Sequence, residues 1–362
     1  MISVVKYTFD TASEYKICIF TFNFNCIMKN IIGTTGRSAI SLSLIIMLTY
    51  LLSIYGTSGK EIITGAERTE IYLSLLEGKK VALVANHTSK INDTHLLDSL
   101  LSLEIDIAKV FTPEHGFRGT ADDGEQLSDY KDQETGIQVI SLYGEKKKPS
   151  PDDLLGIELV MFDIQDVGMR FYTYISTLHY VMEACAENHV EFVVFDRPNP
   201  NGFYVDGPIL DLEHKSFVGM NPIPVVHGLT VAEYARMVNG ERWLKNGIQC
   251  KLKYIPCENY DHNKAYELPI KPSPNLPNML SIYLYPSLCL FEGTIMSVGR
   301  GTDFPFQVFG HPEYQSDLFS FTPVSKEGAS NPKYEGIECK GVDLRDIDPV
   351  FFWQERRINL DC

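Results

Sequence analysis

The stretch that decides the fold is Leu159-Val160-Met161-Phe162, an apolar run that stops at the polar cluster Asp163-Ile164-Gln165-Asp166. Three other apolar runs end in the same way: residues 81–85 before Asn86-His87, residues 108–111 before Thr112-Pro113-Glu114-His115, and residues 192–195 before Asp196-Arg197-Pro198-Asn199. Short continuous apolar runs rich in Val and Phe are typical of strands buried on both faces of a parallel sheet. Ligands of such sheets bind outside the carboxyl ends of the strands, where these polar clusters lie.

Stretches with helical spacing separate the expected strands. Helices are predicted at residues 93–103, 173–187 and 230–238, and Thr230 and Glu233 have the spacing of a capping box. Alternating strands and helices predict an α/β fold built on a Rossmann-like parallel sheet.

Past about residue 247 the sequence no longer alternates between buried strands and helices. A strand-like alternation at 251–256 is followed by a proline-rich link at 268–277 and a helical stretch at 279–291. We therefore expect a Rossmann-like domain over residues 60–245 and a smaller α+β domain over 246–362. The apolar start at Phe351-Phe352-Trp353 has no matching finish, so we expect this second domain to be incomplete.

Residues 1–59 are expected to lie outside the folded domains. Residues 39–55 form an uncharged apolar stretch with Lys29 and Arg37 before it and small residues after it, which is the layout of an export signal. Met28 is a more natural start for such a signal than Met1, so the preceding residues are interpreted as an upstream extension. A stretch of this length is marginal for a membrane span, so an uncleaved anchor is the alternative, and no stable span is expected after signal cleavage.

Composition narrows the class of protein. The formal net charge is −15 and no long Lys/Arg run offsets it, which argues against nucleic-acid binding. The chain contains no G-x-S-x-G, G-x-x-x-x-G-K-[ST] or H-E-x-x-H motif. A lone histidine at a strand end usually hydrogen-bonds locally, so no metal or cofactor is expected.

The sharpest local signal is Thr112-Pro113-Glu114-His115-Gly116-Phe117-Arg118. A glutamate just beyond a buried strand, held by Pro113 and followed by the permissive Gly116, is placed to act as a general acid in a crevice. On position alone, the alternatives that Glu114 caps a helix or pairs with Arg118 are equally good.

Residues 163–174 form a longer motif with two carboxylates, Gln165, Arg170 and the tyrosines Tyr172 and Tyr174. Aromatic faces pack on the apolar face of a sugar ring while carboxylates and amides bind its hydroxyls, so this pattern suits sugar recognition. The alternative is an Asp163–Arg170 ion pair among core aromatics. Arg197, at the end of its strand, is able to clamp a carboxylate bidentately, and residues 297–302 offer backbone amides and another arginine, Arg300.

Taken together, these motifs resemble the NamZ-type exo-β-N-acetylmuramidases, long catalogued as a family of unknown function. The matching stretches are residues 84–89, 112–119, 162–174, 194–202, 224–228, 272–277 and 292–310. The resemblance implies a Rossmann-like domain, a smaller second domain and a cleft between them that hydrolyses N-acetylmuramic acid glycosides of peptidoglycan. It also implies that the catalytic glutamate is Glu114. Family members continue beyond the end of this chain, which departs from the pattern from about Asp346.

We therefore predict an exported glycoside hydrolase that releases N-acetylmuramic acid from non-reducing ends of peptidoglycan fragments during cell-wall turnover. Glu114 is assigned as the general acid and Asp166 as the second catalytic carboxylate, with Asp163 as runner-up. Arg197 is the preferred partner of the lactyl carboxylate, ahead of Arg118, Arg170 and Arg300. The remaining predicted substrate-binding residues are Asn86, His87, His115, Asp163, Gln165, Tyr172, Tyr174 and Asn199. The alternatives are an exported muropeptide- or sugar-binding protein without turnover, an endo-acting muramidase, and a peptidoglycan amidase or esterase.

Overall fold

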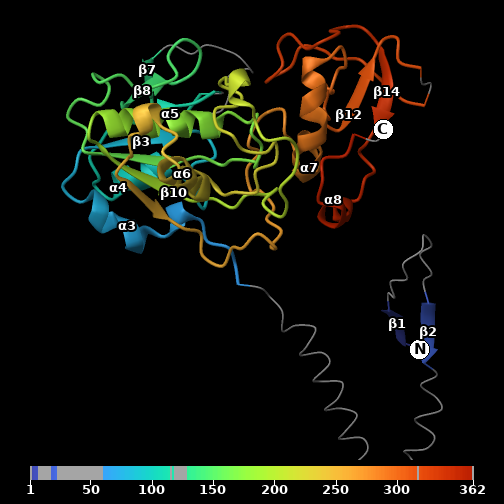
Figure 1. Cartoon of the computed structure of the whole chain (residues 1–362), viewed down its shortest axis with the longest axis horizontal. Helices are drawn as coiled ribbons and strands as arrows, with labels where there is room; N and C mark the ends of the chain where they lie inside the picture. The colour runs from blue at the N-terminus through green and yellow to red at the C-terminus, as the bar shows by residue number, and fades with distance from the viewer. Residues whose placement is uncertain are drawn as a thin grey trace, which may run out of the picture. The chain divides into compact units, whose positions relative to one another are not determined.

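The computed structural model describes residues 60–114, 116–117, 129–315 and 318–360, together with two short strands near the N-terminus (Figure 1). These strands, β1 (Ile2–Lys6) and β2 (Cys18–Phe22), pair antiparallel. The chain divides into two compact units, Met1–Glu61 and Ile62–Cys362, and all other elements belong to the second. The predicted export segment at residues 39–55 lies outside the described residues. Among the residues that are described, no helix is long and apolar enough to cross a membrane.

A seven-stranded sheet is the centre of the second unit as far as the structure describes it. Its strand order is β11-β10-β9-β3-β6-β8-β7, and all neighbours are parallel except β7 and β8. The strands are β3 (Val81–Ala85), β6 (Ile107–Thr112), β7 (Tyr130–Lys131), β8 (Gln138–Ser141), β9 (Leu159–Asp163), β10 (Glu191–Phe195) and β11 (Leu252–Ile255). The four apolar runs that predicted parallel strands are β3, β6, β9 and β10, which confirms that prediction. They are neighbours in the sheet, so the polar clusters that follow them start from one edge.

Helices cover both faces of this sheet (Figure 1). The side chain of Val84 packs in a core shared with α5 and α6, whereas that of Leu83 packs in a core shared with α3 and α4. Because both faces are buried, the strands are apolar throughout rather than alternating, as is typical of parallel sheets. The helices are α3 (Thr69–Leu76), α4 (Leu96–Ser102), α5 (Tyr174–Glu187) and α6 (Val231–Gly240), with short 3₁₀ turns η1 (Gly65–Glu67), η2 (Leu212–His214) and η3 (Lys245–Gly247). The predicted Rossmann-like α/β class is confirmed.

The starts of α6 and α4 show how local sequence sets a helix end. The hydroxyl of Thr230 accepts the N–H of Glu233 at 3.3 Å, and the Glu233 carboxylate accepts the N–H of Thr230 at 2.8 Å, so the predicted capping box is present. Helix α4 begins later than predicted because a small hairpin, β4 (Lys90–Ile91) and β5 (Thr94–His95), precedes it.

The C-terminal region (residues 279–360) follows an irregular link. Helix α7 forms over the predicted stretch despite containing Pro286. In the part that the structure describes, β12, β14 and β13 form a three-stranded antiparallel sheet. The elements are α7 (Met279–Leu288), η4 (Cys289–Gly293), β12 (Val308–His311), β13 (Ser320–Phe321), β14 (Cys339–Asp343) and α8 (Val350–Glu355). The ring of Trp353 in α8 stacks on Phe203 with centroids 4.0 Å apart, so the last helix packs on the loop that follows β10.

Strand β11 belongs to a different sheet from the one that the predicted domain boundary implies. Strand β11 was assigned to the second domain, but its residues Leu252 to Ile255 pair in parallel register with Phe192 to Phe195 of β10. The parallel sheet therefore extends to residue 255, past the boundary expected near 245. Strand β11 is a partly exposed edge strand, so its sequence alternates like an antiparallel strand and misled the prediction.

Candidate active site

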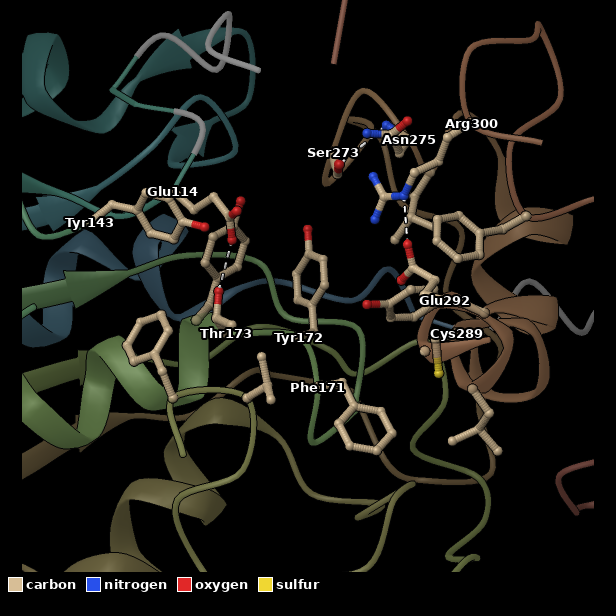
Figure 2. A pocket seen from close by; sticks show the side chains of 18 residues that line it. Glu114, Tyr143, Phe171, Tyr172, Thr173, Ser273, Asn275, Cys289, Glu292 and Arg300 are labelled. Atoms are coloured by element: carbon tan, nitrogen blue, oxygen red, sulfur yellow. Dashed lines mark hydrogen bonds and ion pairs between the residues drawn. The ribbon is translucent and has the colours of Figure 1, made fainter. Parts of the chain in front are cut away.

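A cavity of about 580 Å³ lies beyond the carboxyl ends of β6, β8 and β9, against the C-terminal region (Figure 2). One side is lined by Glu114, Tyr143, Phe171, Tyr172, Thr173, Tyr174, Phe217 and Val218. The other is lined by Ser273, Asn275, Leu276, Tyr285, Cys289, Leu290, Glu292, Gly293, Arg300 and Phe306. The walls therefore combine aromatic rings with a few polar groups, which is the usual composition of a small-molecule site.

Glu114 reaches this cavity from the turn that follows β6. Gly116 has the left-handed φ of 73°, and its N–H donates to the Pro113 carbonyl at 3.2 Å, so the predicted permissive glycine closes the turn. The Thr173 hydroxyl donates to Oε2 of the half-buried Glu114 side chain at 3.1 Å. Glu114 is thus held at the cavity wall by a residue from the turn before α5. The predicted site residues His115 and Arg118 lie outside the described residues.

Tyr172 and Tyr174 form the wall between the sheet and the link. Their hydroxyls donate to the same carbonyl, that of Pro272, at 2.8 and 3.4 Å. Burial raises the pKa of Tyr174 above its usual range. Hydrogen bonding with Tyr172 acts to lower this pKa, whereas the negative charges of Glu114 and Asp166 raise it further. Both predicted tyrosines therefore line the cavity, and they stay protonated.

The predicted role of Arg197 is contradicted by the structure. Its Nε and one terminal nitrogen bind the two carboxylate oxygens of Asp163 at 2.6 and 2.8 Å, and neither residue lines the cavity. Burial acts to lower the pKa of Arg197, but the Asp163 charge outweighs it and the pKa is raised. The pair joins the ends of β9 and β10, so Asp163, the runner-up catalytic carboxylate, is a structural partner. The alternative Asp163–Arg170 pair is also wrong.

Asp166, the predicted second catalytic carboxylate, lies behind the cavity wall. It is 3% exposed, does not line the cavity, and accepts the N–H of Gly168 at 2.7 Å. His227 Nε2 lies 3.7 Å from the same oxygen. Gly168 has φ of 80°, and a Cβ there would fall 2.4 Å from the Asn199 side chain, so this turn requires glycine. The structure therefore does not place Asp166 on the wall of the cavity.

Three more predicted binding residues are buried and bonded to the backbone. Gln165 donates to the carbonyls of Asp166 and Pro198, and Arg170 donates to those of Pro208 and Ile223. Asn199 donates to the Leu229 carbonyl and accepts the N–H of Asn201. None of the three lines the cavity. They shape the loops behind it, as amide and guanidinium groups do when they satisfy buried carbonyls.

The polar cluster after β3 also differs from the prediction. Asn86 is fully buried, and its side-chain oxygen accepts the N–H and hydroxyl of Thr88 at 2.9 and 2.6 Å. His87 donates to the Lys271 carbonyl at 2.8 Å and lines a second cavity of about 620 Å³. This second cavity shares Ser273 and Asn275 with the first.

Four cavity residues come from the segment 292–310: Glu292, Gly293, Arg300 and Phe306. Arg300 was predicted as one of four candidate arginines, and its Nε donates to Glu292 Oε1 at 2.7 Å. Glu292 and Thr173 were missed. Glu292 follows a helix rather than a strand, so the strand-end argument does not reach it. Its presence in the motif that also contains Arg300 was the available signal.

Two family models and one curated relative match this chain. Residues 81–280 match the family described as exo-β-N-acetylmuramidase NamZ, N-terminal, and residues 283–356 match its C-terminal counterpart. The chain is 40% identical over 303 residues to the peptidoglycan β-N-acetylmuramidase NamZ of Bacillus subtilis, covering 76% of this chain and 70% of that protein.

Two crystal structures of DUF1343 family proteins from Bacteroides fragilis are also similar. One is 48% identical with a TM-score of 0.77, covering 83% of this chain and 81% of the other; the second is 31% identical with a TM-score of 0.71, covering 82% and 79%. The chain therefore belongs to the NamZ family of exo-β-N-acetylmuramidases and is a glycosidase.

Proposed function

We propose that this protein hydrolyses the β-glycosidic bond of N-acetylmuramic acid at non-reducing ends of peptidoglycan fragments. The observation that carries the proposal is the position of Glu114, held by Thr173 on the wall of a cavity lined with aromatic rings. Aromatic faces pack on the C–H face of a sugar, and a carboxyl group on the wall is able to protonate the leaving oxygen. The 40% identity to a β-N-acetylmuramidase supports the choice of sugar.

In this proposal Glu114 is the general acid. Glycoside hydrolysis passes through an oxocarbenium-like transition state, and the leaving oxygen requires a proton as the bond breaks. The hydroxyls of Tyr172 and Tyr174 donate hydrogen bonds to the Pro272 carbonyl. Among the described residues on that wall of the cavity, Glu114 is therefore the available acid. The same residue then acts as the general base for the incoming water.

We do not assign Asp166 the role of second catalytic carboxylate that the sequence predicted. Glu292 lines the cavity but is ion-paired with Arg300, and Asp166 does not line it, although its charge acts on Tyr172 and Tyr174. The acetamido oxygen of an N-acetylated sugar attacks the anomeric carbon in some glycosidases, so the chemistry does not require a second carboxylate nucleophile. We assign Asp166 to electrostatic support of the tyrosine wall rather than to contact with substrate.

We also propose that the protein is exported and takes part in cell-wall turnover. The support is the apolar stretch at residues 39–55 with Lys29 and Arg37 before it. Expression of the full chain in bacteria, followed by fractionation and N-terminal sequencing, tests this. A processed protein outside the cytoplasm is expected, whereas an unprocessed cytoplasmic protein would contradict export.

The activity itself is tested on defined glycans. Chains that end in N-acetylmuramic acid and matched chains that end in N-acetylglucosamine are incubated with the protein, and products are identified by mass spectrometry. Free N-acetylmuramic acid from the first chains, with the second left intact, is the expected result. Internal fragments would identify an endo-acting enzyme, and intact chains in both cases would favour a binding protein without turnover.

A further inference from the structure

The side chain of Arg300 brings positive charge to the cavity wall. Of the lysines and arginines that the structure describes, it alone lines the cavity. Its Nε donates to Glu292 at 2.7 Å, and its guanidinium carbon lies 5.0 Å from the centroid of the Phe306 ring. Figure 2 shows Arg300 and Glu114 on opposite sides of the cavity, with Tyr172 between them. A ligand that fills the space between these side chains meets an acid at one end and a guanidinium at the other.

The backbone around Arg300 is held in a turn that requires glycine on both sides of it. Gly299 and Gly301 both have left-handed φ, 78° and 81°. A Cβ on Gly299 would fall 2.7 Å from Val308, and one on Gly301 would fall 2.6 Å from the Val324 carbonyl oxygen. The N–H and hydroxyl of Thr302 both bond to the Gly299 carbonyl, at 3.1 and 2.6 Å, and close the turn. Arg300 therefore projects from a rigid turn that only glycines permit on either side.

The sugar in the proposed reaction carries a matching group. N-acetylmuramic acid differs from N-acetylglucosamine by a lactyl ether that ends in a carboxylate. Burying this carboxylate is costly unless a cation pairs with it, and the planar guanidinium fork suits a carboxylate better than an ammonium group does. We infer that Arg300 is the specificity-determining residue that selects N-acetylmuramic acid by binding its lactyl carboxylate. This inference rests on the proposed function of the cavity.

The other described arginines near the strand ends already bind groups of the protein itself. Arg197 binds both oxygens of Asp163, and Arg170 binds two backbone carbonyls. Glu292 is a positioning residue in this scheme, because it holds the Nε side of Arg300 while Phe306 lies against the guanidinium face. The lactyl carboxylate is then placed across the cavity from Glu114.

The kinetic test compares Arg300→Met and Arg300→Lys with the wild-type protein. Chromogenic β-glycosides of N-acetylmuramic acid and N-acetylglucosamine are the two substrates, and the ratio of their kcat/KM values is measured. Arg300→Met should lower the preference for the muramic sugar by about tenfold to a hundredfold, and Arg300→Lys by less, because it keeps the charge but loses the fork. A ratio unchanged in Arg300→Met would overturn the inference.

Arg345 provides a matched control. It also lies over an aromatic ring, 4.3 Å from the Phe304 centroid, and is also paired with a carboxylate, Asp343, at 2.6 Å, but it does not line the cavity. Arg345→Met should keep the wild-type ratio. A fall in the ratio equal to that of Arg300→Met would show that the effect is not specific to the cavity and would also overturn the inference.

A binding measurement separates this inference from the proposed function. Calorimetric titration with free N-acetylmuramic acid and free N-acetylglucosamine gives the preference in Kd without any turnover. Tighter binding of the muramic sugar by the wild type, and its loss in Arg300→Met, supports the role of Arg300 even if the wild type hydrolyses neither glycoside. Equal affinity of the wild type for both sugars contradicts it, whatever the hydrolysis assay shows.

Discussion

The Thr173 hydroxyl donates a hydrogen bond to Oε2 of Glu114 at 3.1 Å, and so connects the turn before α5 with the turn after β6. The two turns follow strands β9 and β6, which are separated in the sheet by β3. This bond orients the carboxyl group that we propose as the general acid. Its orientation therefore depends on the relative position of two loops rather than on either loop alone.

Replacing this hydroxyl tests the orientation directly. Thr173→Val keeps the shape of the side chain but removes the donor, so we expect kcat to fall about three- to tenfold, with a smaller change in KM. Steady-state kinetics on the muramic glycoside checks this, and circular dichroism controls for folding. A wild-type kcat in a folded variant would show that Thr173 does not position Glu114.

The Asp163–Arg197 pair should matter for stability rather than for specificity. Arg197→Met leaves a buried carboxylate without its partner, so the free energy of unfolding should fall by about 3–5 kcal/mol in urea denaturation. The exposed pair Arg357–Glu355 is the control, since Arg357→Met should cost less than about 1 kcal/mol. Equal effects of the two substitutions would contradict the structural role of Arg197.

Asp196 should make stability depend on pH. Burial raises its pKa to about 6, despite the N–H of Ala232 and the hydroxyl of Thr230, which favour the charged form. The native state then binds this proton more tightly than the unfolded state does. Its contribution to stability is present at low pH and is lost as the pH rises from about 4 through 6, by about 3 kcal/mol at most.

The Asp196→Asn variant isolates that contribution. Urea unfolding at pH 4.5, 5.5 and 7 should show wild type losing stability relative to the variant as the pH rises. Parallel stability profiles would contradict the raised pKa.

Asp166 should contribute less to catalysis than Glu114. It lies behind the cavity wall and accepts the Gly168 N–H, so Asp166→Asn is expected to lower kcat/KM by no more than about tenfold. The same assay on both variants checks this. A loss as large as that of Glu114→Gln would restore Asp166 as a catalytic carboxylate.

Much of the fold could be predicted because its strands and helix starts are set by residues that are close together in the sequence. The runs that became β3, β6, β9 and β10 are apolar throughout because both faces of the sheet are covered, and the Thr230 capping box sets the start of α6 within a few residues. Strand β11 was misassigned because an edge strand is partly exposed, and nothing in its alternation tells which sheet it joins.

The candidate site was predictable only in part. The cavity is lined by four of the predicted residues: Glu114, Tyr172, Tyr174 and Arg300. The arginine that pairs with Asp163, however, depends on which strands are neighbours in the sheet, and the sequence pattern does not give the strand order. Adjacent strands β9 and β10 bring Arg197 to Asp163 and remove both from the site. Glu292 reaches the cavity from the 3₁₀ turn after α7 in the C-terminal region, which no strand-end pattern anticipates.

The most direct test of the central claim is the rate of hydrolysis of a chromogenic N-acetylmuramic acid β-glycoside by Glu114→Gln, with calorimetric binding of N-acetylmuramic acid measured on the same protein. The amide keeps the size of the side chain and its capacity to accept from Thr173, but it has no acidic proton to transfer. We predict that kcat falls by about a hundredfold to ten-thousandfold while Kd changes only severalfold. A Glu114→Gln protein that hydrolyses the glycoside at the wild-type rate would contradict the assignment of Glu114 as the general acid.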